Sequence, residues 1–158
     1  MLVDDVLLPN GKKSTRELIR HCKASAVLAF DDNGNVILED QFRYPYNTVI
    51  TEIPAGKADG DEDPLVTAKR ELLEETGYEA NDIALLGEFY PSVAYTDEVI
   101  YLYEAHSLKK KEQHLDADES LSFYFKSFEE FKRMVSEGKI KDGKTLAALA
   151  YYLLKRAM

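Results

Sequence analysis

The 158-residue sequence contains a single cysteine, no tryptophan and no long hydrophobic run. Cys22 alone cannot form an internal disulfide, so the fold must depend on a packed core and nothing indicates an oxidising compartment. No segment approaches the ~20 apolar residues of a membrane span, and the first residues carry no basic leader. We therefore expect a cytoplasmic protein.

Basic residues are also scarce, because 20 lysines and arginines stand against 29 aspartates and glutamates, a net charge of −9. Proteins that bind nucleic acid or anionic membranes concentrate positive charge on one face, so this balance argues against both partners. The negative charge does not exclude small phosphate compounds as ligands, since carboxylates can hold them through divalent cations. With 45% hydrophobic residues and no low-complexity tract, the sequence predicts one globular domain over residues 1–158.

Strand and helix patterns alternate along the chain, which predicts an α/β fold with a mixed sheet. The turn residues Pro9-Asn10-Gly11 predict an N-terminal hairpin over residues 3–21. Ser127 with Glu130 predicts a capped helix that ends near Gly138, and an apolar stripe indicates one more helix after it. Apolar or β-branched runs predict strands over residues 24–30, 36–39, 49–53, 83–90, 98–105 and 121–125.

The clearest helix lies between Asp63 and Gly77. Asp63 is a suitable N-cap, Pro64 suits the first helical position, and Gly77 suits the exit. Between them, apolar residues recur at helical spacing and form one face, at Leu65, Ala68, Leu72 and Leu73.

The same helix carries a group of glutamates. Glu71 and Glu75 are four residues apart and share one face, with Glu74 beside them. Like charges at this spacing destabilise a helix by about 0.2–0.5 kcal/mol per pair, so stability alone does not explain them. A cation such as Mg²⁺ removes the repulsion, because it binds carboxylate oxygens and keeps waters or substrate phosphates as its other ligands. Arg70 can pair with Glu74 or with Glu62 and hold that carboxylate in place.

A lone pair of glutamates on a helix is more simply a solvated acidic face. Here the pattern is longer, and a chance match in a chain of this length is on the order of one in a million at average residue frequencies. The fixed positions are Gly56, Glu62, Arg70, Glu71, Glu74, Glu75 and Gly77.

These residues resemble, position by position, the signature of the Nudix hydrolases, which cleave a nucleoside diphosphate linked to another moiety. Their resemblance implies a Nudix-type α/β/α sandwich with a mixed sheet, a Nudix box at residues 56–78 and assembly as a homodimer. Further segments resemble the ADP-ribose pyrophosphatase branch, namely Gln41-Phe42-Arg43-Tyr44-Pro45, Glu52-Ile53-Pro54-Ala55-Gly56-Lys57, Phe89-Tyr90-Pro91-Ser92 and Asp97-Glu98.

The resemblance also implies an activity, which is the hydrolysis of ADP-ribose or a related nucleoside diphosphate sugar to a nucleoside monophosphate and a sugar phosphate. The expected cofactor is Mg²⁺, with Mn²⁺ as the alternative. The implied metal ligands are the Ala55 carbonyl, Glu71, Glu75 and Glu119. The implied catalytic residues are Arg70, Glu74, Glu75 and Glu119. The residues expected to contact substrate are Arg43 at a phosphate, Glu98 on the sugar side, and Lys57 and Ser92.

Two departures from this branch keep alternatives open. Ser92-Val93-Ala94 stands where the branch has Ser-Pro-Gly, and Asp116-Ala117-Asp118-Glu119 has one glutamate where relatives often have two. One alternative is the same chemistry on another nucleoside diphosphate derivative. The other is a catalytically silent Nudix domain that senses a nucleotide.

Overall fold

The computed structural model describes residues 1–112 and 121–158 and confirms a mixed α/β fold. No helix in this part of the chain is long and apolar enough to cross a membrane. The elements are, in chain order, β1 (Leu2–Leu7), β2 (Lys13–Leu18), β3 (Ala24–Ala29), β4 (Asn35–Arg43), the 3₁₀ helix η1 (Tyr44–Tyr46), β5 (Thr48–Glu52), β6 (Ala55–Lys57), α1 (Pro64–Thr76), β7 (Tyr78–Phe89), β8 (Ile100–Lys110), β9 (Leu121–Ser127), α2 (Phe128–Ser136) and α3 (Gly143–Ala157).

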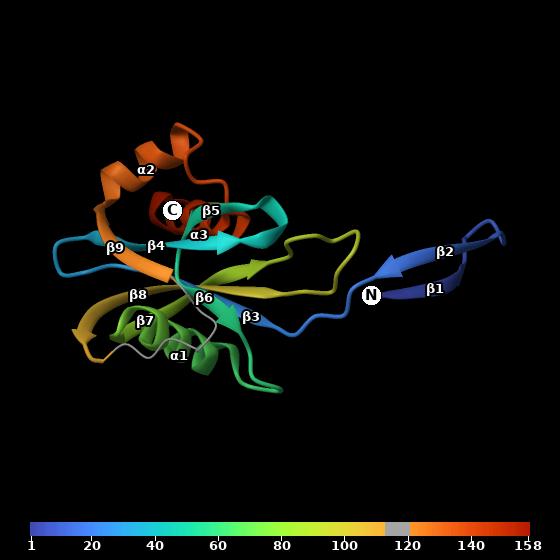
Figure 1. Ribbon diagram of the computed structural model, residues 1–158, viewed down its shortest axis with the longest axis horizontal. Coiled ribbons are helices and arrows are strands. Elements are labelled where there is room, and N and C mark those ends of the chain that lie inside the picture. The colour runs from blue at the N-terminus through green and yellow to red at the C-terminus, as the bar shows by residue number, and fades with distance from the viewer. Residues whose placement is uncertain (113–120) are drawn as a thin grey trace.

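The strands form two sheets and a separate hairpin. One sheet has the order β6-β3-β8-β7 and the other β5-β4-β9, while β1 pairs only with β2. β3 and β8 run parallel and the other pairs are antiparallel, so the first sheet is mixed. Figure 1 shows α1 on one side of the sheets, α2 and α3 on the other, and the β1–β2 hairpin extending away from the body.

β3 is buried along its whole length because helices cover both of its faces. Successive side chains of a strand point to opposite faces, and the core follows this alternation. Leu28 belongs to the cluster that contains Phe131 of α2 and Leu149 of α3. Its neighbour Val27 belongs to the cluster that contains Leu72 of α1. The expected α/β/α layering is therefore confirmed.

The boundaries of α1 are those that the sequence predicts. The Asp63 carboxylate accepts a hydrogen bond from the Leu65 amide at 2.9 Å and caps the first turn. Gly77 ends the helix in the left-handed region, with φ of 69°, and its amide donates to the Leu73 carbonyl at 2.8 Å. These two caps hold the acidic face of α1 in a defined position.

Several strands are longer than the sequence predicts. β7 begins at Tyr78, directly after α1, and its ladder with β8 runs from the Tyr78–Lys110 pair to the Phe89–Ile100 pair. The additional residues are largely polar or exposed, so no apolar pattern marks them, and their strand conformation comes from the partner strand.

Candidate functional site

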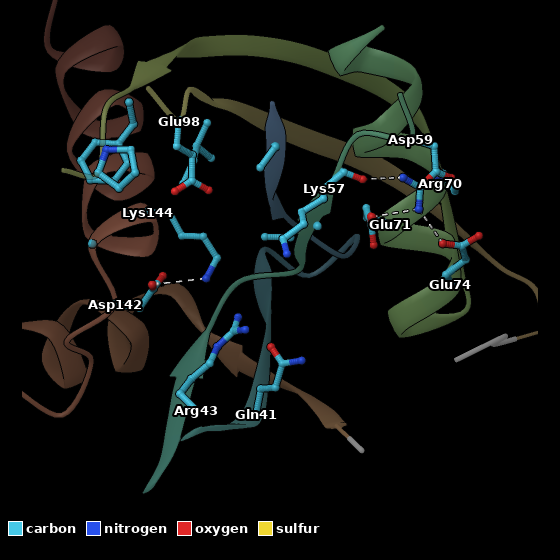
Figure 2. A pocket seen from close by; sticks show the side chains of 17 residues that line it. Gln41, Arg43, Lys57, Asp59, Arg70, Glu71, Glu74, Glu98, Asp142 and Lys144 are labelled. Carbon is cyan, nitrogen blue, oxygen red and sulfur yellow. Dashed lines mark hydrogen bonds and ion pairs between the residues drawn. The ribbon is translucent and has the colours of Figure 1, made fainter. Parts of the chain in front are cut away.

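A cavity of about 640 Å³ lies between β4, β6, α1 and the beginning of α3. Figure 2 shows Glu71, Glu74 and Arg70 on one side of it and Arg43 and Lys144 on another. Anionic and cationic side chains thus face one cavity from different elements. Such an arrangement suits a ligand that carries phosphates and is bound partly through a cation.

Two buried carboxylates form the core of the acidic side. Glu75 is 1% exposed and Glu71 8% exposed, and both project from the same face of α1. The Ala55 amide of β6 donates to Glu75 Oε2 at 2.9 Å. A Cβ atom at Gly56 would lie 2.0 Å from the Glu71 carboxyl carbon, so only glycine allows this approach of β6 to the helix.

Arg70 connects the acidic residues around this pair. Its Nη1 donates to Glu71 Oε1 at 2.8 Å and to Glu74 Oε2 at 2.9 Å. Its Nη2 donates to Glu62 Oε2 at 3.0 Å and to the Lys57 carbonyl at 2.8 Å. Arg70 therefore pairs with Glu74 and with Glu62 at once. Its hydrogen bond lowers the pKa of Glu62 to about 2, so this carboxylate is charged at neutral pH.

The acidic side fits a divalent cation in the chemistry of its donors. Carboxylates are hard oxygen ligands, and Glu71 and Glu75 are held at adjacent turns of α1 by Arg70 and the Ala55 amide. Within residues 1–112 and 121–158, no three His, Cys, Asp or Glu side chains form a metal-binding group. Glu119, which the sequence predicts as a further ligand, lies outside the described residues.

The cationic side is organised by Glu52, which is 1% exposed. Arg43 donates to both of its oxygens, Nε to Oε1 at 2.7 Å and Nη2 to Oε2 at 2.6 Å. Lys144 Nζ also donates to Glu52 Oε2 and lies 3.2 Å from Asp142 Oδ1. Sequence reasoning assigned no individual role to Glu52, Asp142 or Lys144. Glu52 and Lys144 are 92 residues apart, and no local pattern links them.

The other residues predicted to contact substrate are Lys57, Glu98 and Ser92, of which the first two lie at the cavity and the third does not. Lys57 and Glu98 line the cavity, and Figure 2 shows the amine of Lys57 directed into it. His21, to which the sequence gave no role, has its Nδ1 3.4 Å from Glu98 Oε1. Ser92 lies in the exposed turn after β7, outside the residues that line the cavity in the described part of the chain.

The chain is similar to known proteins over most of its length. The family described as NUDIX domain matches residues 20–149, so the chain belongs to the Nudix family. A relative named ADP-ribose pyrophosphatase, from Bacillus subtilis strain 168, is 41% identical over 100% of this chain and 86% of its own length. A relative named methanol dehydrogenase activator, from Bacillus methanolicus, is 44% identical over 99% of this chain and 85% of its own length.

A solved structure described as an ADP compounds hydrolase superposes with a TM-score of 0.84. It covers 94% of this chain and 80% of its own, at 21% identity. At that identity the likeness is one of fold, and it confirms the expected Nudix architecture.

Proposed function

We propose that this protein is a metal-dependent Nudix pyrophosphatase that hydrolyses ADP-ribose or a related nucleoside diphosphate sugar. The products would be a nucleoside monophosphate and a sugar phosphate. The observation that carries the proposal is a pair of buried carboxylates on α1 at a cavity that has cations on its other side. Glu71 lines the cavity and lies against Gly56, and Glu75 accepts a hydrogen bond from the amide of Ala55, which also lines the cavity. The relative named ADP-ribose pyrophosphatase, which matches over the whole chain, supports the substrate class.

The cation would be held by Glu71, Glu75 and the Ala55 carbonyl, with Glu119 as a further ligand, and Mg²⁺ is the expected ion, with Mn²⁺ as the alternative. Such an ion, when bound, neutralises charge on the diphosphate and lowers the pKa of a coordinated water. The chain's own contribution is orientation. Arg70 holds Glu71 and Glu74 at fixed distances, which keeps the acidic side in one arrangement before substrate arrives.

Arg43 would bind a phosphate of the substrate. Its guanidinium keeps Nε and Nη2 on Glu52 and has Nη1 for an anion, and a planar fork suits phosphate oxygens. Glu98 would accept hydrogen bonds from sugar hydroxyls, and Lys57 would add positive charge at the same wall. Water then forms a bond to one phosphorus while the bridging phosphoanhydride bond breaks, so each half of the substrate leaves as a phosphate monoester.

Phosphate-coupled turnover of a panel of substrates tests this proposal. The panel holds ADP-ribose, other nucleoside diphosphate sugars and dinucleoside polyphosphates, each assayed with Mg²⁺, with Mn²⁺ and with excess chelator. We expect metal-dependent release of AMP and ribose 5-phosphate, fastest for ADP-ribose. The same assay compares Glu75→Gln, which should lose turnover, with Glu129→Gln, the same substitution at an exposed residue, which should retain wild-type rates. Absence of turnover on every compound, with ADP-ribose still bound, would favour the nucleotide sensor instead.

The 44% identity to a protein named methanol dehydrogenase activator favours a second candidate function, the stimulation of a dehydrogenase. This candidate is tested by adding the protein to a methanol dehydrogenase and measuring its rate. If the wild type stimulates the dehydrogenase and Glu75→Gln does not, the stimulation requires the hydrolytic site. Stimulation that persists in this variant would separate the two.

We further propose that the chain is one Nudix domain that acts as a cytoplasmic homodimer. The β1–β2 hairpin extends from the body (Figure 1) and exposes Leu2, Val3 and Leu7. A two-stranded hairpin without a packed face is marginally stable in water, so a second copy of the chain would supply the missing contact. Light scattering after gel filtration should give twice the chain mass of 18.0 kDa. A mass of one chain at micromolar concentration would refute the dimer.

A further inference from the structure

The backbone amide of Ile53 is held by a residue of α3. Ile53 follows β5 and is fully buried, at the place where the chain passes from one sheet to the other. Its amide donates to Thr145 Oγ1 at 3.0 Å, and Thr145 is also fully buried. A buried backbone N–H needs a hydrogen-bond partner, and here a side chain 92 residues away in the sequence supplies it.

The Thr145 hydroxyl is oriented for this contact. Its Oγ1 donates to Asp142 Oδ2 at 2.6 Å, and the same carboxylate oxygen accepts from the Thr145 amide at 2.9 Å. A hydroxyl has one hydrogen, so with that hydrogen on Asp142 its oxygen is left to accept from Ile53. The amide contact by itself caps α3, as an amide contact to Asp63 caps α1. The hydroxyl contacts are therefore not needed to begin the helix, and they fasten the segment before β6 to it.

The segment that begins at Ile53 reaches the acidic side of the cavity within two residues. The Pro54 carbonyl accepts from the Val27 amide at 2.9 Å, and the Ala55 amide donates to Glu75 Oε2 at 2.9 Å. Three consecutive residues are thus fastened to α3, to β3 and to α1. The ring of Pro54 fixes φ in the middle of this segment, so a displacement of Ile53 is passed on to Ala55 because rotation about that bond cannot absorb it.

We propose that Thr145 is a positioning residue for the metal site, although it does not itself line the cavity. It fixes the Ile53 amide and thereby the backbone of Ala55. The Ala55 carbonyl is a proposed metal ligand, and the Ala55 amide orients a second one, Glu75. A carbonyl ligand has no side-chain rotation by which to adjust, so the fastening of its backbone decides where its oxygen lies. This inference rests on the proposed function and makes the first turn of α3 a support of the metal site.

Binding of Mn²⁺ without substrate, measured by electron paramagnetic resonance of the free ion, tests this role. Thr145→Val has nearly the same shape and lacks the hydroxyl. Thr145→Ala also lacks it and places no methyl group against Asp142, so a measurement remains if the valine variant does not fold. We expect both variants to raise the Kd for Mn²⁺ by roughly 10-fold or more, the effect of losing a contact that orients metal ligands. Thr145→Ser keeps the hydroxyl and should bind Mn²⁺ nearly as tightly as the wild type.

Leu149→Ala is the matched control for stability. Leu149 is a buried residue one turn further along α3, packed in the cluster that contains Phe131, and it does not line the cavity. Its truncation destabilises the fold by leaving a cavity in the core but keeps the contact between Thr145 and Ile53. The Kd for Mn²⁺ should therefore keep its wild-type value. An increase equal to that of Thr145→Val would show that loss of stability alone weakens the metal site, and would overturn the inference.

Steady-state kinetics with ADP-ribose supply a second readout. The Mg²⁺ concentration that gives half the maximal rate should rise in Thr145→Val by the same factor as the Kd for Mn²⁺. The KM for ADP-ribose at saturating Mg²⁺ should stay close to the wild-type value, because Thr145 acts on the metal side of the cavity. A higher KM with an unchanged Mg²⁺ requirement would overturn the inference, since Thr145 would then act on substrate binding.

The outcomes distinguish this inference from the proposed function. If the wild type hydrolyses ADP-ribose with Mg²⁺ but Thr145→Val keeps the wild-type Kd for Mn²⁺, the inference is overturned and the proposed function stands. If the wild type binds Mn²⁺ but hydrolyses nothing, a raised Kd in Thr145→Val supports the inference while the proposed function fails. A wild type that does not bind Mn²⁺, or a serine variant that binds it as weakly as the valine variant, overturns the inference.

Discussion

Replacement of Gly56 by alanine is the sharpest test of the acidic site, because it adds one methyl group at a known place. The new Cβ would lie 2.0 Å from the Glu71 carboxyl carbon and 2.1 Å and 2.3 Å from its two oxygens. Contact at van der Waals distance requires the carboxylate to move by at least about 1.4 Å. The clash involves the end of a side chain, and Gly56 does not have a positive φ, so the backbone itself tolerates alanine.

The expected effect is therefore large on activity and modest on stability. A reacting or ligating group misplaced by about 1 Å lowers rates by roughly 100-fold, so we expect at least that loss in kcat/KM for ADP-ribose. Overpacking destabilises by about 1–3 kcal/mol, and the lower entropy of the unfolded chain offsets about 0.4–1 kcal/mol of it. Metal-dependent turnover and urea unfolding measure the two effects separately.

A matched control is available at Gly87. A Cβ at this position would lie 2.8 Å from the Tyr151 ring, which is outside the cavity lining. Gly87→Ala should lower the stability to a similar degree and leave kcat/KM within a few-fold of wild type. The reasoning fails if Gly56→Ala retains wild-type activity and metal dependence, because the position of Glu71 would then be irrelevant to catalysis.

Three further predictions concern α1 and its surroundings. Glu75→Gln keeps an oxygen that can accept a hydrogen bond from the Ala55 amide but removes the negative charge. We therefore expect kcat to fall by more than about 100-fold while the circular dichroism spectrum stays unchanged. A near-wild-type kcat would show that Glu75 is not a metal ligand. The lowered pKa of Glu62, about 2 against an ordinary value of 4.5, means that its pairing with Arg70 stabilises the fold above about pH 4.5 and is lost as the pH falls through about 2. The stability difference between wild type and Glu62→Gln, from urea unfolding, should accordingly shrink over this interval, and a difference independent of pH would contradict the pairing. Leu72→Ala, at a fully buried position of α1, should lower the free energy of unfolding by about 2–5 kcal/mol, and a loss below 1 kcal/mol would mean that the site collapses around the smaller side chain.

Local chemistry explains what could be predicted about α1. Its start and end follow from Asp63, Pro64 and Gly77, whose capping and conformational preferences act within a few residues. The shared face of Glu71 and Glu75 follows from helical periodicity alone. The segment that carries the acidic residues can therefore be predicted from local sequence preferences, without tertiary contacts.

Other features depend on partners that are distant in sequence. The extension of β7 to Tyr78 comes from its ladder with β8. The parallel pairing of β3 with β8 joins two strands that are separated in sequence by four other strands and α1. Sequence spacing offered Arg70 either Glu62 or Glu74, and the fold brings both within 3.0 Å. Local sequence preferences do not decide which strands pair or which carboxylate Arg70 binds, and the tertiary contacts between distant segments do.

The sequence by itself determined the bounds of α1 and the grouping of its glutamates, because these depend on capping and periodicity over one short segment. It also determined the fold class, because strand and helix patterns alternate along the whole chain. Only the tertiary structure decided how the cationic side is built. Glu52 and Lys144 lie 92 residues apart and meet because α3 begins at the cavity edge. A buried ion pair of this kind depends on the distance between two elements, and no spacing along the chain encodes that distance.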